Sequence, residues 1–405
     1  MIRSLRTGVT GLKSHQAKMD VTGNNIANVN TVGFKRSRAV FNEVLGQRLL
    51  GLSTSNSGVT SGIVGYGVKV GSVAQNWNQG ALEFTSIPTD LALNGDGFFI
   101  ARNSEKYLMT RAGNFIFDEN GTLVTTDGIP IQGYAVDVNG DVDVSQLGNI
   151  KLDYGQQEPP TATENIVIAN NLSTSTAVGE SVDTQTGIYD EQGRLHSVNI
   201  RFTKTGADSW DYEVRYTGTE TTPPFADITG SLSFNVDGSI ATTTPLTLTW
   251  DPNYVGGGGT VSIGVDKITQ YDRNSTASVI DRDGQTSGQL ESYDFESDGT
   301  MWLNFTNGER RRAYQLVIGT VNNLQALENL GDNFFGVTPG SGDLMLGRAG
   351  REITTSIVAG ALEQSNTDLA TEFTDMIVAQ RGYQASARVI TTSDELLQEV
   401  VQLKR

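Results

Sequence analysis

The chain contains no cysteine and only two histidines, His15 and His196, among its 405 residues. Without cysteine it has no disulfide framework, no thiol nucleophile and no thiolate metal site. A zinc site or a Ser-His-Asp triad would have to recruit one of the two histidines. We expect both to be surface or packing residues, and we expect no catalytic residue, no metal site and no cofactor.

Long apolar runs and positive charge are also scarce. No run of 18 apolar residues occurs, so we expect no membrane span. Arg3 and Arg6 are not followed by a continuous apolar segment, so we expect no cleavable secretory signal. The net charge of -17 argues against nonspecific nucleic-acid binding.

The few positive charges are unevenly placed. Residues 1 to 50 carry a net charge of +6, and the remainder carries -23. A basic N-terminal arm on an acidic body fits head-to-tail contacts between copies. It equally fits a solvated helix face without a partner, and charge alone does not decide between them.

Glycine is abundant, with 46 residues, and Thr, Val, Asn and Asp are frequent, which predicts β-structure with many turns. One pattern recurs: an aromatic residue, three turn residues, glycine, one further residue and an aliphatic residue. It occurs at 117–123, 189–195, 234–240 and 295–301. Each copy predicts a hairpin in which glycine supplies a positive φ, and the irregular spacing argues against a solenoid.

Two other stretches are interpreted as turns. Residues 91–100 predict a strand, a turn and a second strand. Residues 137–143 superficially resemble a calcium loop, but an EF-hand needs glycine at position 6 and glutamate at position 12. Those positions hold Val142 and Gly148 here. We therefore expect a turn and no calcium site.

Both ends of the chain carry heptad patterns. The C-terminal seam consists of Leu369, Phe373, Met376, Gln380, Tyr383, Ala387, Ile390, Asp394, Leu397 and Val401. The N-terminal seam consists of Ile2, Leu5, Val9, Leu12, Gln16 and Met19, and it stops at Gly23. Sustained heptads predict helices that need a partner, so we expect an antiparallel or staggered pair joining the termini. The alternative is that each helix docks separately on the main body.

Two long motifs border these seams. The first spans residues 21–35 and includes Asn24, Asn25, Ala27, Asn28, Asn30, Gly33 and Phe34. The second spans residues 379–399 and includes Gln380, Arg381 and Tyr383. Both resemble the terminal signatures of the flagellar axial proteins, the rod, hook and hook-associated subunits of the bacterial flagellum. The Gly-Phe-Lys and Gln-Arg-Gly-Tyr forms, and the chain length, look more like the hook members than the distal rod members.

The sequence predicts a mainly β fold with terminal α-helices, in which nested β-domains follow a coiled-coil-like helical pair. Residues 1–30 and 366–405 would form the helical core, and residues 31–70 an extended connector. Residues 71–145 and 285–365 would form an inner β-domain, and residues 146–284 an inserted outer one. Asn366 and Asp368 offer N-cap chemistry for the last helix.

Nesting places both termini together, so copies joined through their helices would build an open helical assembly. The resemblance implies a structural subunit of a curved tube that acts as a flexible joint and transmits motor torque. It also implies rod, hook-cap and hook–filament junction partners, unfolded passage through the flagellar type III apparatus and an extracellular location. We expect the terminal helices to fold fully only on assembly. The alternative hypotheses are a rod or other axial subunit, and an enzyme or adhesin carried on the β-domains.

Overall fold

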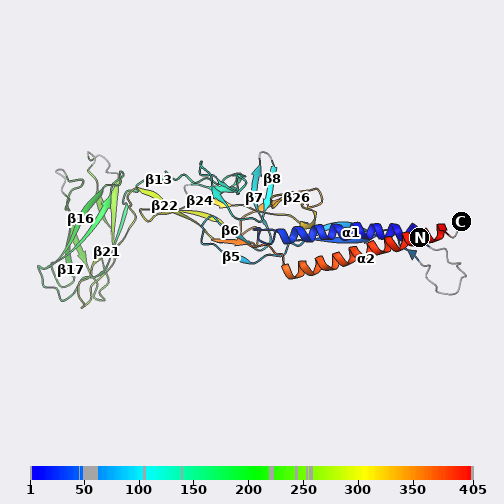
Figure 1. Cartoon of the computed structure of the whole chain (residues 1–405). Coiled ribbons are helices and arrows are strands. Elements are labelled where there is room, and N and C mark those ends of the chain that lie inside the picture. The colour runs from blue at the N-terminus through cyan, green and yellow to red at the C-terminus, as the bar shows by residue number, and fades with distance from the viewer. Residues whose placement is uncertain are drawn as a thin grey trace, which may run out of the picture. The chain divides into compact units, whose positions relative to one another are not determined.

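A computed structural model of the chain describes residues 2–44, 46–48, 63–103, 106–137, 140–218, 223–241, 245–251, 254 and 259–402. The fold is mainly β with one long helix at each end, α1 (Ile2–Ala27) and α2 (Leu369–Gln402), as Figure 1 shows. This confirms the predicted fold class. The Ser-rich part of the predicted connector, 51–58, lies outside the described residues.

The chain divides into two compact units. Unit 1 comprises Met1–Asp153, Tyr293–Trp302 and Arg311–Arg405, and unit 2 comprises Tyr154–Ser292 and Leu303–Arg310. The predicted outer domain, 146–284, overlaps most of unit 2. The finer division into helical core, connector and inner domain stays a prediction.

In the first half of unit 1, helix α1 is followed by short strands. They are β1 (Ser37–Glu43), β2 (Gln47–Arg48), β3 (Ile63–Val64), β4 (Val68–Gln75), β5 (Leu82–Phe84), β6 (Leu91–Asn94), β7 (Phe98–Asn103), β8 (Lys106–Thr110), β9 (Ile116–Phe117), β10 (Leu123–Val124), β11 (Gln132–Val136) and β12 (Val142–Asn149). Strands β1 and β4 pair antiparallel and form a two-stranded ribbon, so both flanks of the predicted connector are ordered strands.

The second half of unit 1 leads back to α2. Its elements are β25 (Ile318–Thr320), the 3-10 helix η1 (Leu324–Ala326), β26 (Glu328–Gly331), β27 (Phe334–Gly336), β28 (Met345–Gly347), β29 (Ser356–Ala359) and β30 (Ala361–Glu363). Strands from both halves build one sheet in the order β26-β27-β8-β7-β25-β28, while β29 pairs with β6 and β30 with β5. The core includes Phe98, Met109 and Phe335, with Trp77 packed edge-on against both phenylalanines. Strands β6 and β7 confirm the strands predicted at 91–100, although they join different sheets.

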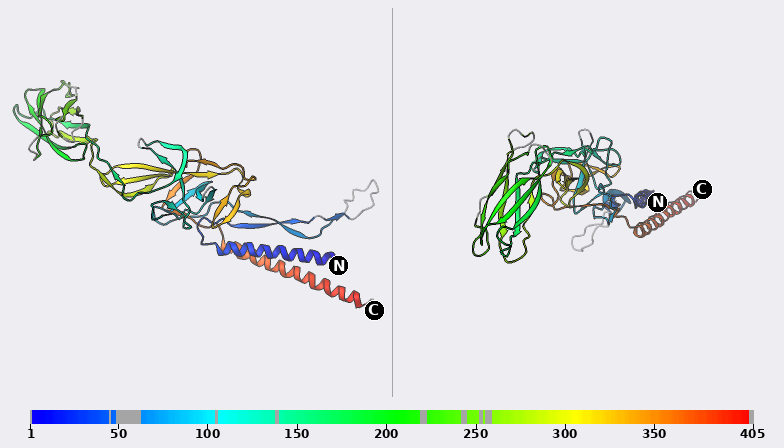
Figure 2. Two further views of the ribbon diagram at one scale, coloured as in Figure 1. Left: turned by 90° about the horizontal axis from the view of Figure 1, so that it is seen from above. Right: turned by 90° about the vertical axis from the view of Figure 1, so that its left-hand side faces the viewer.

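Unit 2 is built around two four-stranded sheets. Its strands are β13 (Gln157–Glu158), β14 (Asn165–Asn171), β15 (Ser181–Tyr189), β16 (Leu195–Lys204), β17 (Ser209–Tyr216), β18 (Ile228–Ser233), β19 (Leu246–Thr249), β20 (Thr260–Thr269) and β21 (Ser278–Arg282). The sheets have the orders β15-β16-β17-β18 and β19-β20-β14-β21. One apolar cluster takes side chains from both, so the core lies between them (Figure 2). Alternation along the strands places one face of each sheet toward this core. In β16, for example, every second residue from His196 to Lys204 is buried.

Three strands have residues in both units: β22 (Gly288–Phe295), β23 (Thr300–Phe305) and β24 (Arg310–Leu316). The chain passes from one unit to the other after Asp153, within β22, within β23 and at the start of β24. In unit 1, β24 pairs with β11, which also pairs with β12.

All four predicted hairpins are present. Phe117 pairs with Leu123, Tyr189 with Leu195 and Phe234 with Ile240, and the fourth turn joins β22 to β23. Their glycines, Gly121, Gly193, Gly238 and Gly299, have φ values between 75° and 84°. The stretch that resembles a calcium loop shows the same turn chemistry, because the Asp137 carboxylate accepts the N–H of Asp141 at 2.8 Å.

Candidate assembly site

The two terminal helices pair antiparallel. Lys18 Nζ lies 2.8 Å from Asp375 Oδ1, and Asn25 Nδ2 donates to Glu372 Oε2 at 3.0 Å. Nearer the start of α1, Gly8 faces Ile390. Residue numbers rise along α1 as they fall along α2, which confirms the predicted antiparallel pairing. Both views in Figure 2 show the two helices side by side.

Small residues make much of the contact between the helices. A Cβ atom at Gly8 would lie 2.9 Å from Ile390 Cγ1, and one at Gly11 would lie 2.9 Å from Ser386 Oγ. In α2, Ala379 is fully buried and Gly382 lies against the His15 ring. These small residues bring the helix axes closer than Leu and Phe side chains would allow, and Ile390 is the seam residue that lies against Gly8.

Apart from Ile390, the seam residues lie beside this contact. In α1, Leu5, Leu12 and Met19 are half-buried, while Val9 and Gln16 are exposed. In α2, Met376, Tyr383, Ala387, Ile390 and Leu397 are half-buried, while Leu369, Phe373, Gln380, Asp394 and Val401 are exposed. At about 100° per residue, both seams are rotated in the same sense from the contact. In an antiparallel pair this places them on one common side, which forms a shared apolar flank.

The asparagine motif ties α1 to its surroundings. Asn25 is buried, and its side chain bonds to both the N–H and the C=O of Ser37, at 2.9 and 2.7 Å, besides Glu372. Asn28 Nδ2 donates to the C=O of Asn24 at 2.9 Å, near the end of the helix at Ala27. The side chains of Asn24, Ala27 and Asn30 are exposed. Only part of the predicted motif therefore contacts other elements.

Gly33 and Phe34 follow the helix. Gly33 is buried with φ 70°, and its N–H donates to the C=O of Glu363 at 2.7 Å. A Cβ there would lie 2.6 Å from the backbone nitrogen of Ala112, so the close approach requires glycine. Phe34 is half-buried, and Arg381 in the second motif is exposed.

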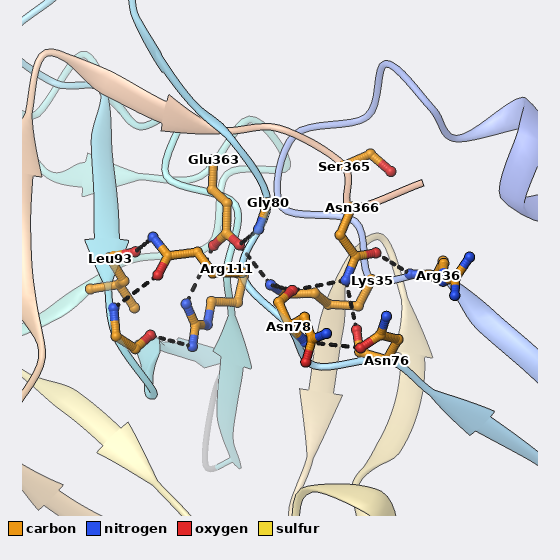
Figure 3. A network of polar contacts seen from close by, with 12 residues as sticks. Lys35, Arg36, Asn76, Asn78, Gly80, Leu93, Arg111, Glu363, Ser365 and Asn366 are labelled. Carbon is orange, nitrogen blue, oxygen red and sulfur yellow. Dashed lines mark hydrogen bonds and ion pairs between the residues drawn. The ribbon is translucent and has the colours of Figure 1, made fainter. Parts of the chain in front are cut away.

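A buried ion triad joins this segment to the β-strands (Figure 3). Lys35 Nζ lies 2.6 Å from Glu363 Oε1, and Arg111 Nη1 lies 3.3 Å from Glu363 Oε2. All three side chains are at most 4% exposed. The N–H of Gly80 also donates to Glu363 Oε1 at 2.8 Å. One carboxylate therefore binds the segment after α1, the end of strand β8 and the segment before β5.

Burial dominates the electrostatics of the triad. Loss of hydration lowers the pKa of Lys35 and that of Arg111 below their ordinary values, while the Glu363 carboxylate opposes the shift in both. A buried ion triad stabilises the fold only while all three partners are present, because a buried charge that loses its counterion has no water to hydrate it. The Gly-Phe-Lys motif contains Lys35 but does not indicate its role in an ion triad, and nothing local in the sequence marks Arg111 or Glu363.

The start of α2 is fixed by two polar residues with different roles. Asp368 is the N-cap: Oδ1 accepts the N–H of Ala370 at 2.9 Å, and Oδ2 accepts the Thr371 hydroxyl at 3.0 Å. The Thr371 hydroxyl bond and the N–H bonds lower the pKa of Asp368. Asn366, offered as an alternative cap, instead accepts the N–H of Arg36 and donates to the carbonyls of Asn76 and Asn78. Asn366 thus joins the segment after α1 to the segment before β5, close to the Lys35–Glu363–Arg111 triad, and does not cap the helix. We call this region, where the triad and Asn366 connect these segments, the junction.

Asp368→Ala is expected to destabilise α2 by about 0.5–2 kcal/mol, because the first turn loses its side-chain acceptor. Asp20→Ala is the matched control, since Asp20 is an exposed carboxylate inside α1. Alanine there should stabilise the helix slightly. Thermal loss of the circular-dichroism signal at 222 nm measures both effects. Equal shifts in the two variants would contradict the capping role.

No helix in the described part of the chain is long and apolar enough to cross a membrane. Four family models match the chain. They are "Flagella basal body rod protein" over 5–35, "Flagellar hook protein FlgE/F/G D1 domain" over 92–180, "Flagellar basal body protein FlaE D2 domain" over 179–285, and "Flagellar basal body rod FlgEFG protein C-terminal" over 358–403. Together with the paired terminal helices, these matches define an axial protein of the bacterial flagellum.

Comparison with similar proteins shows which kind of axial protein this chain resembles. The chain is 33% identical to the flagellar hook protein FlgE of Borreliella burgdorferi and 32% identical to that of Treponema pallidum, over the full length of both chains in each case. It is 30% identical to FlgE of Escherichia coli over 98% of each chain. The chain belongs to the flagellar hook protein family, and it is a structural subunit of the flagellar hook.

A solved structure supports the fold. The crystal structure of Helicobacter pylori flagellar hook protein FlgE2 matches with a TM-score of 0.54 and 14% identity, covering 70% of this chain and all of the other. The rod alternative is not favoured, because these full-length relatives are named as hook proteins.

Proposed function

We propose that the chain polymerises through its terminal helices into a curved, hollow helical tube that transmits motor torque from rod to filament as a flexible joint. The observation that carries this proposal is the apolar surface of α2. Leu369, Phe373, Ile377, Val378, Val389, Leu396, Val400 and Val401 are each between 41% and 68% exposed. A soluble monomer rarely leaves this many large apolar side chains of one helix in water, so other copies are the expected cover.

The exposed apolar residues occur on two sides of α2. Leu369 and Phe373 belong to the flank shared with α1. Val378 and Leu396 lie on the other side of the contact with α1 when residues are placed about 100° apart, and Val389 borders Gly8 within the contact. A helix with two apolar sides beyond its partner suits the interior of a bundle, where it meets more than one neighbouring copy.

The remaining parts of the proposal rest on the family. We infer that the subunit passes unfolded through the flagellar type III apparatus without cleavage and works outside the cell. We also infer that it contacts rod, hook-cap and hook–filament junction proteins. This role needs no catalytic residue and no cofactor, and the open assembly follows from contacts that do not close on themselves.

Polymerisation of the purified chain tests the proposal. Electron microscopy should show curved tubes, and Phe373→Ser should prevent their formation while leaving unit 2 folded. Antibody against residues 146–284 should label a short curved segment between filament and envelope on purified flagella. Label within the envelope would assign the protein to the rod, and absence of tubes from the unmodified chain would overturn the proposal.

Helix content should rise when subunits assemble. In the free chain the apolar sides of α2 face water, so its ends gain little from burial and isolated helical turns are only marginally stable. Neighbouring copies would cover them in the tube. The signal at 222 nm per residue should therefore be larger in the polymer than in the monomer. Equal signals would contradict folding on assembly.

A further inference from the structure

A basic groove lies next to the start of α2. It has a volume of about 580 Å³ and is lined by Arg36, which precedes β1, by Arg38 of β1, by β4 and the residue after it, and by Gln325. Arg36 Nη1 is 3.3 Å from Glu372 Oε1, in the first turn of α2, which fixes the position of the groove. Arg38 is exposed, and its guanidinium has no carboxylate partner among the residues that the structure describes. The groove therefore offers an exposed guanidinium to an incoming acidic group.

An acidic surface lies at the other end of α2. Glu395 and Glu399 are exposed and stand one turn apart on the same side of the helix. Like charges at this spacing repel each other, and no ion pair relieves them within the described part of the chain. Beside them, Leu396 and Val400 are 53% and 49% exposed. The last turns of α2 therefore present an acidic stripe next to an apolar one.

These last turns also extend past the partner helix. Gly8, in the second turn of α1, lies against Ile390, yet α2 continues to Gln402. In Figure 2 the red end of α2 runs beyond the start of α1. This end is thus free to enter a site on another molecule.

We propose that the Arg36/Arg38 groove binds the acidic last turns of α2 from a second copy of the chain. This inference rests on the proposed function and names one contact of the assembly. The charges are opposite, and Val73 at the groove, 53% exposed, matches the apolar side of the incoming helix. Clusters of one sign facing the other favour a defined register between copies.

Geometry excludes the same contact within one copy. Helix α2 has 34 residues and so is about 51 Å long. The groove lies at its first turn and the acidic stripe at its last turns. A contact between opposite ends of one rigid helix joins different copies head to tail, and repeating it gives an open row and not a closed ring.

Charge reversal in the full-length chain tests the contact. Arg38→Glu alone and Glu399→Arg alone should each raise the critical concentration for polymerisation about tenfold, equivalent to 1.4 kcal/mol. Mixing the two variants should restore polymerisation. In the mixture, the carboxylate that R38E places in one groove can meet the guanidinium that E399R places on the helix end of the other variant. Each unchanged groove of the E399R variant can meet an unchanged acidic end of the R38E variant. A role within one copy cannot be restored in this way.

Controls separate the outcomes. Lys69→Glu reverses an exposed charge on β4 outside the groove and should leave the critical concentration unchanged. Arg38→Ala should show a smaller rise than R38E. Polymerisation unaffected by either reversal, or impaired without rescue in the mixture, would overturn the contact while leaving the proposed function intact. Failure of the unmodified chain to polymerise would overturn the proposed function itself.

Discussion

Glu363→Gln is expected to destabilise unit 1 by about 3–5 kcal/mol. The substitution keeps the shape of the side chain but removes the only carboxylate that contacts both Lys35 and Arg111 in the described structure. Two cations that are 1% and 4% exposed would then lack their counterion. Hydrogen exchange of the amides in β5, β6, β29 and β30 should accelerate, because these strands surround the junction.

Unit 2 provides an internal reference for this experiment. Its amides should keep their protection in E363Q, since its core has its own apolar cluster. Glu119→Gln is the matched control, because Glu119 is exposed in a hairpin turn. Unchanged exchange at β30 in E363Q would show that the triad contributes little to stability.

A second substitution sharpens the interpretation. Adding Lys35→Met to E363Q should recover part of the lost protection, because one of the two unpaired buried cations is then removed. The recovery should be incomplete, since Arg111 stays without its carboxylate and the C=O of Asn78 loses one of its two donors, Lys35 Nζ at 3.0 Å. A double variant less stable than E363Q would mean that Lys35 contributes mainly through packing.

Local patterns in the sequence were enough to predict the terminal helices and the hairpins. A heptad repeat needs only the residues of one helix, and each hairpin is encoded within seven consecutive positions. Pairing of the two helices, either antiparallel or staggered, was also predicted, because two matched helices at the chain ends need partners. What the pattern could not show is which side of each helix makes the contact. Gly8, Gly11 and Gly382 interrupt apolar spacing and were not interpreted as contact residues, although small residues permit the closest approach.

The contacts of the buried ion triad and of Asn366 could not be predicted from the sequence, and the reason is a different one. Lys35 and Glu363 are far apart in the chain, and each is an ordinary charged residue in its local context. Their burial depends on strands β5, β6, β29 and β30 meeting at one place. The same holds for Asn366, which resembles a helix cap in sequence but bonds to Asn76 and Asn78 once those segments are brought together. Long-range pairing decides such roles, and one sequence without an alignment does not reveal it.

Gly382→Leu is expected to separate the two terminal helices and to destabilise them by about 1–3 kcal/mol. A Cβ at this position would lie 2.4 to 2.8 Å from three atoms of the His15 ring. The ring has little room to turn, because it packs edge-on against Phe41 with centroids 6.0 Å apart. Leucine is a far better helix former than glycine, so intrinsic propensity alone would predict stabilisation.

Gly23→Leu isolates that propensity. Gly23 lies inside α1, and a Cβ there meets no atom within 4 Å among the described residues. This variant should therefore raise the helical signal at 222 nm and delay its thermal loss, by up to about 1 kcal/mol. G382L should lower the signal in the same free subunit, and it should also reduce polymerisation. The opposite signs of the two glycine substitutions would establish the helix contact as the cause, because both make the same chemical change in a helix. Stabilisation by both would instead mean that the helices pair too loosely for small residues to matter.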